Sequence, residues 1–109
     1  MFVNLSNHPS ETWSERQRAA AESLGGPIVD EPFPEVPPEA STEEVEALGA
    51  TTFQRIALSD PAAVMIQGEF TLTLALVRKF QERGIPCYSA TTGKARFDFV
   101  QFRQYPSVN

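Results

Sequence analysis

Cysteine, histidine and long apolar runs are scarce in this chain of 109 residues. Because Cys87 is the only cysteine, neither a disulfide within the chain nor a multi-cysteine zinc site can form. With one histidine and no pair of carboxylates at ligand spacing, we expect neither a metal nor a cofactor. No apolar run approaches the roughly 18 residues that cross a bilayer. The first residues also lack the basic start and long apolar core of a secretory signal, so we expect a cytoplasmic protein without membrane contact.

Charge is divided unevenly along the chain. Residues 1–69 carry 3 of the 9 basic and 12 of the 14 acidic side chains, a sum of −9, whereas residues 70–109 sum to +4. A protein that binds duplex DNA is expected to be basic over a broad face, so this composition disfavours that partner. A small anion held by a few Lys or Arg side chains is compatible with it. So is the simpler interpretation that the acidic side chains only solvate two outer helices.

The stretch from Ala62 to Thr92 decides the fold class. It contains an apolar run, a glycine break, an apolar helix pattern, a second glycine and another short apolar run, which is typical of a βαβ unit. A chain of this length builds one core. We therefore predict a single α/β domain over residues 1–109, a Rossmann-like three-layer fold with a mainly parallel sheet and a C-terminal antiparallel strand.

The remaining elements follow from local patterns. Capping boxes at Ser14 and Ser41 predict the first two helices, and the third helix is expected at about residues 70–83. Residues 30–38 hold four prolines, which favours a rigid connector on the surface or, as an alternative, a lid. The predicted strands span residues 1–5, 27–29 with an alternative end at 33, 62–66, 85–90 and 95–103. The last strand changes its apolar phase near Phe99, which indicates either two apolar faces or a bulge.

The third predicted helix is apolar around most of its circumference, and its charged residues crowd into the last two turns. Such a helix buries more than one face. One face can pack on the sheet, and the other needs either a neighbouring helix or a second subunit. In a protein this small the second subunit is a plausible partner.

Function should lie where the parallel strands end, because open α/β folds bind ligands at that edge. Three loops are expected to meet there, namely residues 6–10, 67–71 and 89–96. Gly68 allows close backbone approach, and the free N–H groups of the helix that follows can bind an anion. A glycine before a helix also occurs as a simple structural break.

Side chains of these loops suit a phosphodiester. Thr71 and Thr73 add hydroxyl donors, and Lys94 and Arg96 can clamp a phosphate. Glu69 would repel that phosphate, so it is either a helix-dipole acid or a partner for a sugar hydroxyl or an adenine amino group.

His8 is the residue to which a proton transfer at neutral pH is most simply assigned, although a lone loop histidine is more often a surface or packing residue. Trp13, Phe33 and Tyr88 can stack on a base, but core or rim positions are the commoner interpretation for each. Cys87 is expected to be an inert core residue.

Three segments carry a family resemblance: N-L-S-N-H-P-S, Q-G-E-F-T-L-T-L-A-L-V and S-A-T-T-G-K-A-R. At these segments the chain resembles the small stand-alone CRISPR-associated proteins of type III systems, which are related to the CRISPR-associated Rossmann-fold (CARF) sensor domains. The likeness covers nearly the whole chain, although its motifs are short.

The resemblance implies a homodimer that binds a cyclic oligoadenylate, most often the four-membered ring, in a shared pocket. Some such proteins are ring nucleases, which cut this second messenger and switch antiviral signalling off, whereas others only sense or sequester it. The matching positions, one group from each loop, are Ser6, Asn7 and His8, then Gly68, Glu69 and Thr71, and finally Thr91, Thr92, Lys94 and Arg96.

The resemblance favours an enzyme, a ring nuclease. RNA carries its own nucleophile, the ribose 2′-hydroxyl, so cleavage requires alignment, a proton acceptor and charge stabilisation rather than a metal. His8 is the expected acid or base, and the other matched residues would hold the ligand. The alternatives are a non-catalytic sensor or sponge and a protein-interaction module of the CRISPR system.

Overall fold

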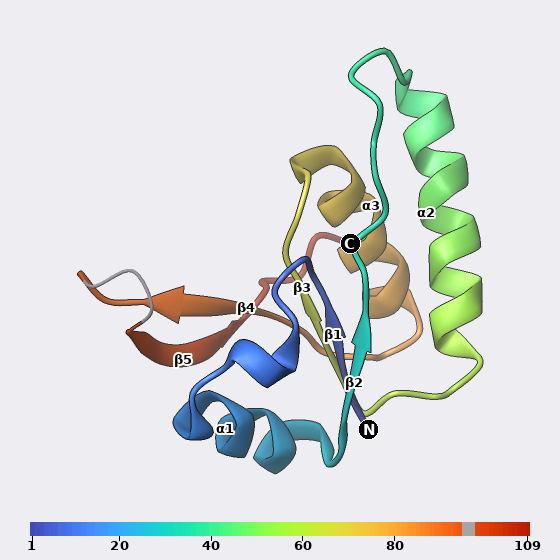
Figure 1. Ribbon diagram of the computed structural model, residues 1–109. Coiled ribbons are helices and arrows are strands. Elements are labelled where there is room, and N and C mark those ends of the chain that lie inside the picture. The colour runs from blue at the N-terminus through green and yellow to red at the C-terminus, as the bar shows by residue number, and fades with distance from the viewer. Residues whose placement is uncertain (95–97) are drawn as a thin grey trace.

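The computed structural model describes residues 1–94 and 98–109. Within these residues the chain forms five strands and four helical segments, whose arrangement can be followed in Figure 1. They are β1 (Phe2–Leu5), the 3-10 turn η1 (Ser10–Thr12), α1 (Glu15–Gly25), β2 (Ile28–Glu31), α2 (Thr42–Ala57), β3 (Ala63–Ile66), α3 (Phe70–Glu82), β4 (Cys87–Thr92) and β5 (Phe99–Gln104).

The strands form one sheet with the spatial order β2-β1-β3-β4-β5. The first four strands are mutually parallel, and β5 runs antiparallel to β4. The predicted fold class is therefore confirmed. In this sheet β2 pairs with one edge of β1, and β3 pairs with the other edge. The direction in which successive strands are added therefore reverses between β1 and β3.

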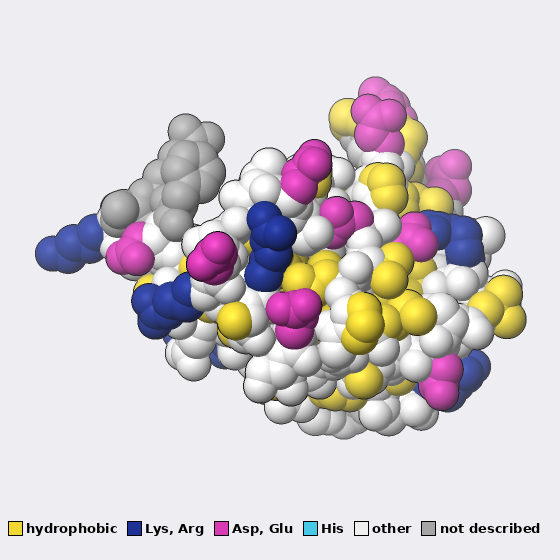
Figure 2. All heavy atoms as spheres, turned by 60° about the horizontal axis from the view of Figure 1, so that its bottom comes forward, with side chains coloured by type: hydrophobic (Ala, Val, Ile, Leu, Met, Phe, Trp, Pro, Cys, Tyr) yellow, Lys and Arg dark blue, Asp and Glu magenta, His cyan; other side chains and the backbone are white. Residues whose placement is uncertain are grey.

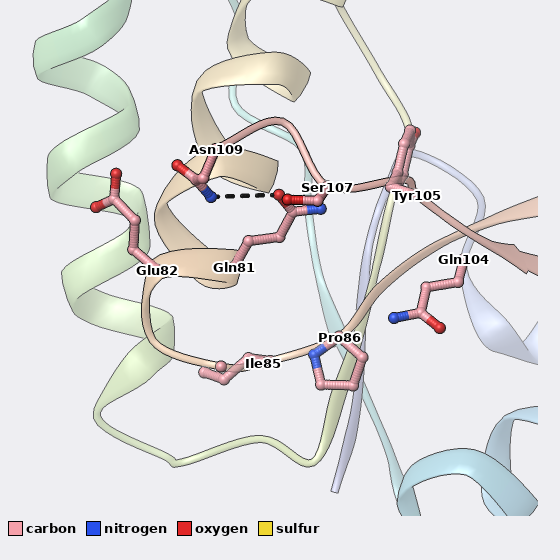
Figure 3. A pocket seen from close by; sticks show the side chains of 9 residues that line it. Gln81, Glu82, Ile85, Pro86, Gln104, Tyr105, Ser107 and Asn109 are labelled. Atoms are coloured by element: carbon pink, nitrogen blue, oxygen red, sulfur yellow. Dashed lines mark hydrogen bonds between the residues drawn. The ribbon is translucent and has the colours of Figure 1, made fainter.

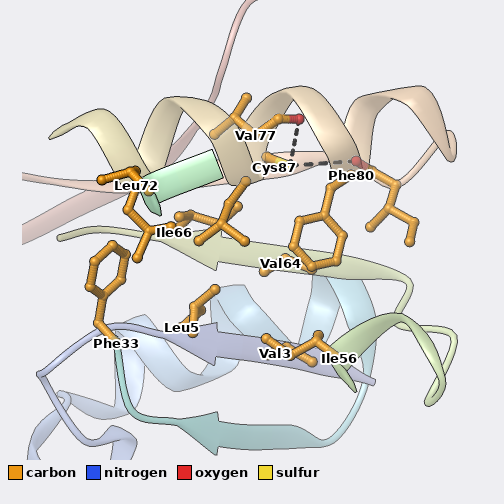
Figure 4. Close-up of a cluster of buried hydrophobic side chains, with 13 residues drawn as sticks. Val3, Leu5, Phe33, Ile56, Val64, Ile66, Leu72, Val77, Phe80 and Cys87 are labelled. Carbon is orange, nitrogen blue, oxygen red and sulfur yellow. Dashed lines mark hydrogen bonds between the residues drawn. The ribbon is translucent and has the colours of Figure 1, made fainter. Parts of the chain in front are cut away.

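Helices cover both faces of the sheet (Figure 1). Alternate residues of a strand point to opposite faces. In β1, Phe2 joins the cluster beneath α1, whereas Val3 and Leu5 join the larger cluster beneath α2 and α3. Figure 4 shows this larger cluster, in which side chains of β1, β3 and α3 interdigitate.

A neighbouring helix, and not only the sheet, buries the apolar circumference of α3. The helices α2 and α3 pack along each other, with the rings of Phe53 and Phe80 at 5.0 Å in an edge-on arrangement. The Arg78 guanidinium binds the Glu46 carboxylate at 2.8 Å across the same contact. Of the two predicted partners for the second apolar face of α3, a neighbouring helix or a second subunit, the structure shows the neighbouring helix, α2. The apolar residues Phe70 and Leu74 of α3 remain exposed.

Several predicted boundaries were wrong by a few residues. The second strand ends at Glu31, because Phe33 leaves the sheet to enter the core. The fourth begins at Cys87 and reaches Thr92 instead of spanning 85–90. The bulge near Phe99 is confirmed by a register shift between Thr91 and Thr92, but the predicted start of that strand at residues 95–97 lies outside the described residues.

Both predicted helix starts are confirmed. Ser14 Oγ accepts from Gln17 N at 3.1 Å, and Ser41 and Glu44 form the complete capping box. In the described ranges, no helix combines the length and the apolar character that crossing a membrane requires.

Candidate functional site

One hollow lies away from the predicted loops, none of whose residues line it. It measures about 560 Å³ and is open to solvent beside the C-terminal tail (Figure 3). Pro86 and Ile85 on its wall precede β4, so the hollow borders the amino end of that strand. Gln81 and Asn109 close one side through a 3.3 Å hydrogen bond. This position is the opposite edge from the one where open parallel sheets bind ligands.

A smaller pocket of about 250 Å³ lies at the carboxyl edge, where the parallel strands end. Its apolar wall is formed by Met65, Trp13 and Phe99, all of them buried. Each of the three predicted loops contributes one polar side chain to the same pocket, namely His8, Gln67 and Thr92, and further polar lining comes from Thr12, Ser14 and Gln17. We call this cavity the edge pocket.

The edge pocket coincides with the reversal of strand order. His8 follows β1 and Gln67 follows β3, and the sheet order reverses between these two strands. The chain leaves β1 toward α1 and leaves β3 toward α3 on the opposite face, so the two connections diverge there. A crevice of this origin is the usual ligand position in open α/β sheets.

A buried polar network fixes the loop that carries His8. Asn4 is 1% exposed, and its Nδ2 donates to Asp30 Oδ1 and to the His8 carbonyl, both at 2.9 Å. Ser6 Oγ donates to Asn4 Oδ1 at 2.6 Å and accepts from His8 N at 3.1 Å. The Trp13 indole N–H also donates to the His8 carbonyl, at 3.1 Å. The backbone of His8 is therefore held from several directions.

Asp30 extends this network to the start of η1. Its carboxylate accepts from Ser10 N at 3.2 Å and from Ser10 Oγ at 3.0 Å. The side chain of His8 is exposed, and it forms no hydrogen bond with any described residue. The imidazole thus stands at the rim of the edge pocket with both ring nitrogens open to a ligand.

Gln67 is fixed by the neighbouring strand. Its Oε1 accepts a short hydrogen bond from Ala90 N of β4. A backbone N–H can only be matched by an acceptor, so this bond sets which way the amide faces. The Gln67 Nε2 then forms no hydrogen bond with any residue in the described ranges, and Gln67 is one of the residues that line the edge pocket.

The predicted anion site at the start of α3 is already filled by the chain itself. Glu69 caps the helix, with Oε1 accepting from Leu72 N at 2.7 Å, and the Thr71 hydroxyl donates to the same carboxylate at 2.7 Å. These hydrogen bonds, first that from Leu72 N, hold the pKa of Glu69 below its usual value. The expectation of free N–H groups for a phosphate was wrong for Leu72, because a carboxylate occupies that position.

Gly68 is required by packing. A Cβ at this position would lie 2.5 Å from the ring of Phe33, which is buried against the end of β3. The Phe33 ring therefore occupies the space beside Gly68 in which a ligand was expected to approach the backbone. Phe33 itself is in the core, as its commoner interpretation had it, and so it does not offer a face for stacking.

The third loop follows β4 into a hairpin that projects from the sheet (Figure 1). Thr91 Oγ1 is bonded to the backbone of Gln101, whereas Thr92 reaches the edge pocket. Lys94 is exposed beyond the strand, and Arg96 lies outside the described residues. Figure 2 shows side chains of both charge signs on this projecting hairpin as well as on the body of the protein.

The structure therefore brings together only part of the predicted set. His8 and Thr92 both line the edge pocket. Gly68, Glu69 and Thr71 do not line it, because Gly68 packs on Phe33 and the Thr71 hydroxyl donates to Glu69. Within the described ranges, no three potential metal ligands of the His, Cys, Asp and Glu types cluster.

Sequence reasoning missed Asn4 and Asp30 as site residues, and it included Gln67 in a predicted loop without giving it a role. A signal existed for Asn4, because it is the one polar residue within the apolar run F-V-N-L of β1. A buried amide in a strand needs partners. The partner Asp30 was not identifiable, because it depends on the pairing register of β1 and β2.

Comparison with known proteins gives a family but no activity. Residues 1–103 match the model of a family described as "Uncharacterized protein MJ1673 family", and the chain belongs to this family. No curated protein matches the chain.

Proposed function

We propose that this member of the MJ1673 family binds a cyclic oligoadenylate and cleaves it without a metal, as its resemblance to the CRISPR-associated ring nucleases implies. The observation that carries the proposal is the convergence of His8, Gln67 and Thr92 on one pocket at the reversal of strand order. This is the position at which open α/β sheets bind nucleotides.

The size of the edge pocket favours one nucleoside for each protein copy. Pockets that enclose a drug-sized ligand measure roughly 300–1,000 Å³. The edge pocket, at about 250 Å³, is smaller than that range, so a ring of four nucleotides cannot enter it whole. A homodimer would present two such pockets to opposite sides of one ring. The cyclic tetra-adenylate is accordingly the ligand to test first.

The chemistry follows from the ligand. The ribose 2′-oxygen attacks the neighbouring phosphorus, the bond to the 5′-oxygen breaks, and a 2′,3′-cyclic phosphate forms. The proton of the 2′-hydroxyl passes to a base, and the leaving 5′-oxygen gains a proton from an acid. His8, which lines the rim with an open imidazole, is the residue we assign to this proton transfer. Lys94 and, in the second copy, its counterpart would offset phosphate charge.

The test is incubation of the protein with cyclic tetra-adenylate in EDTA, followed by separation of the products. We expect linear products that end in a 2′,3′-cyclic phosphate, and a loss of cleavage in His8→Gln, which keeps hydrogen-bonding atoms but can neither take up nor release a proton at neutral pH. An uncut ring removes the enzymatic proposal. Cleavage at the normal rate by His8→Gln removes His8 from the mechanism.

A non-catalytic sensor or sponge is the second candidate. It is favoured by the His8 imidazole, which no described side chain orients by a hydrogen bond. Catalytic bases are commonly held by a further group. Tight binding of the ring with full recovery of intact ligand would identify this function.

A protein-interaction module is the third candidate. It is favoured by Phe70, which is 89% exposed, and by Leu74, 58% exposed and one turn further along α3. Exposed apolar side chains of this size often mark a contact surface. In this case the double substitution Phe70→Ser with Leu74→Ser would abolish partner binding, whereas Lys94→Ala would leave it unchanged.

A further inference from the structure

We propose that Gln67 is the residue that selects adenine in the edge pocket, by reading the base edge formed by N1 and the N6 amino group. This inference rests on the proposed nucleotide function and names the part of the ligand that the pocket recognises. It concerns base specificity, for which the sequence offered Glu69 as a partner of the adenine amino group, whereas in the structure Glu69 caps α3.

The pocket wall suits a flat aromatic ring. Met65, Trp13 and Phe99 are 2%, 8% and 5% exposed, and all three line the cavity. Trp13 is held in place, because its indole N–H donates to the His8 carbonyl and its ring packs on Phe2 and Phe102. A wall of fixed apolar and aromatic groups is the environment that a base would occupy.

Gln67 presents a donor and an acceptor at known positions. Its Oε1 already accepts from Ala90 N, and an amide oxygen has a second lone pair. Its Nε2 has no hydrogen bond with any described residue, so both of its hydrogens are free for a ligand. A glutamine amide with one free donor beside one free acceptor is the group that pairs with the adjacent acceptor and donor of adenine.

The direction of entry selects the edge that is read. A nucleotide enters with its base first and leaves its ribose and phosphates at the mouth. The N1 and N6 atoms of adenine lie opposite the bond to the ribose, so they reach furthest into the pocket. There Nε2 of Gln67 would donate to N1, and Oε1 would accept from the N6 amino group. His8 and Thr92 are exposed whereas Gln67 is half-buried, so His8 and Thr92 would lie with the ribose and the phosphate at the mouth.

The pairing predicts rejection of hypoxanthine, the base of inosine. In hypoxanthine N1 carries a hydrogen and an oxygen replaces the amino group, so a donor faces Nε2 and an acceptor faces Oε1. Both hydrogen bonds are lost, and buried polar groups remain unpaired. A pocket that recognises only shape and stacking would bind the two bases alike.

The experiment is calorimetric titration of cyclic tetra-adenylate and of the ring with inosine at every position. We expect the wild-type protein to bind the inosine ring at least about tenfold more weakly, a ratio that corresponds to 1.4 kcal/mol or more. Gln67→Glu keeps an acceptor for Ala90 N but replaces the pocket donor with a carboxylate oxygen. It should lose at least about tenfold in affinity for the adenine ring. Gln54→Glu, an exposed change of the same charge on α2, should bind like the wild type.

The outcomes separate the two proposals. If the wild type binds the adenine ring but does not distinguish it from the inosine ring, or if Gln67→Glu binds like the wild type, the assignment of Gln67 is wrong and the proposed function stands. If the wild type does not bind the adenine ring, both fall. The comparison of two ligands on the wild type does not depend on whether Gln67→Glu folds.

Discussion

Asn4 and Asp30 lie opposite each other on the adjacent parallel strands β1 and β2, and Asn4 Nδ2 donates a hydrogen bond of 2.9 Å to Asp30 Oδ1. The same Asn4 amide donates to the His8 carbonyl, and the same Asp30 carboxylate accepts from Ser10. This pair, a buried amide and an exposed carboxylate, thus joins two strands to the loop on the rim of the edge pocket.

Replacing Asn4 with alanine should destabilise the protein by about 1–3 kcal/mol, because the buried Ser6 hydroxyl loses its acceptor and the hydrogen bonds from Asn4 to Asp30 and to the His8 carbonyl are lost. Urea unfolding measures the difference. Asn7→Ala is the matched control, since Asn7 is exposed in the same loop. Equal stability of the two variants would show that the network does not hold the loop.

The sequence predicted the fold more completely than it predicted the candidate site. Apolar runs and glycines identified β3, α3 and β4 because those signals are local. The function of Gly68 depends on Phe33, which is distant in the chain and reaches Gly68 only after folding. The carboxylate of Glu69 is close in sequence, yet whether it caps α3 or faces a ligand depends on its rotamer. Contacts between side chains therefore cannot be predicted from a local sequence pattern, whereas the apolar periodicity of helices and strands can.

Gly68→Ala should cost about 1–3 kcal/mol through overpacking, because the new Cβ would meet the Phe33 ring at 2.5 Å. If the clash is the cause, combining it with Phe33→Leu should recover part of that loss, since a smaller side chain makes room. A double-mutant cycle from urea unfolding measures this coupling. Strict additivity of the two substitutions would contradict the proposed contact.

Glu69→Gln should lower stability at pH 7 and have no effect in strong acid. The folded-state pKa of Glu69 lies below its ordinary value of 4.5, chiefly through the hydrogen bond from Leu72 N. A lowered carboxyl pKa contributes stability above 4.5, and this contribution is lost as pH falls through the folded-state pKa. At pH 7 we expect a difference of about 0.3–1 kcal/mol, typical of an exposed acid at a helix start.

Thermal unfolding across this pH range measures the effect of Glu69→Gln. Glu35→Gln provides the control, because Glu35 is exposed in the connector before α2. A difference that stays constant from pH 7 into strong acid would mean that the carboxylate charge does not stabilise α3.

Cys87 should resist thiol reagents in the folded protein. Burial raises the pKa of Cys87 to about 12, and its thiol lies 3.6 Å from the Ile85 carbonyl within the core (Figure 4). Since the thiolate is the reactive form, a disulfide reagent at pH 8 should label Cys87 only as fast as the protein unfolds. Rapid labelling under native conditions, compared with a sample in guanidinium, would contradict this position.

Lys94→Glu should weaken binding of cyclic tetra-adenylate by about tenfold or more, because it reverses a charge that we assign to the phosphates. Lys79→Glu is the matched control, since Lys79 is the only other lysine of the chain and lies on α3 beside α2. The effect of Lys94→Glu should shrink at high salt, where exposed charges are screened. Calorimetry at two salt concentrations distinguishes a direct charge contact from a folding defect, because only the charge contact depends on salt in this way.

Equal losses of affinity in both lysine variants would mean that overall charge, and not the position of Lys94 on the hairpin, governs the affinity.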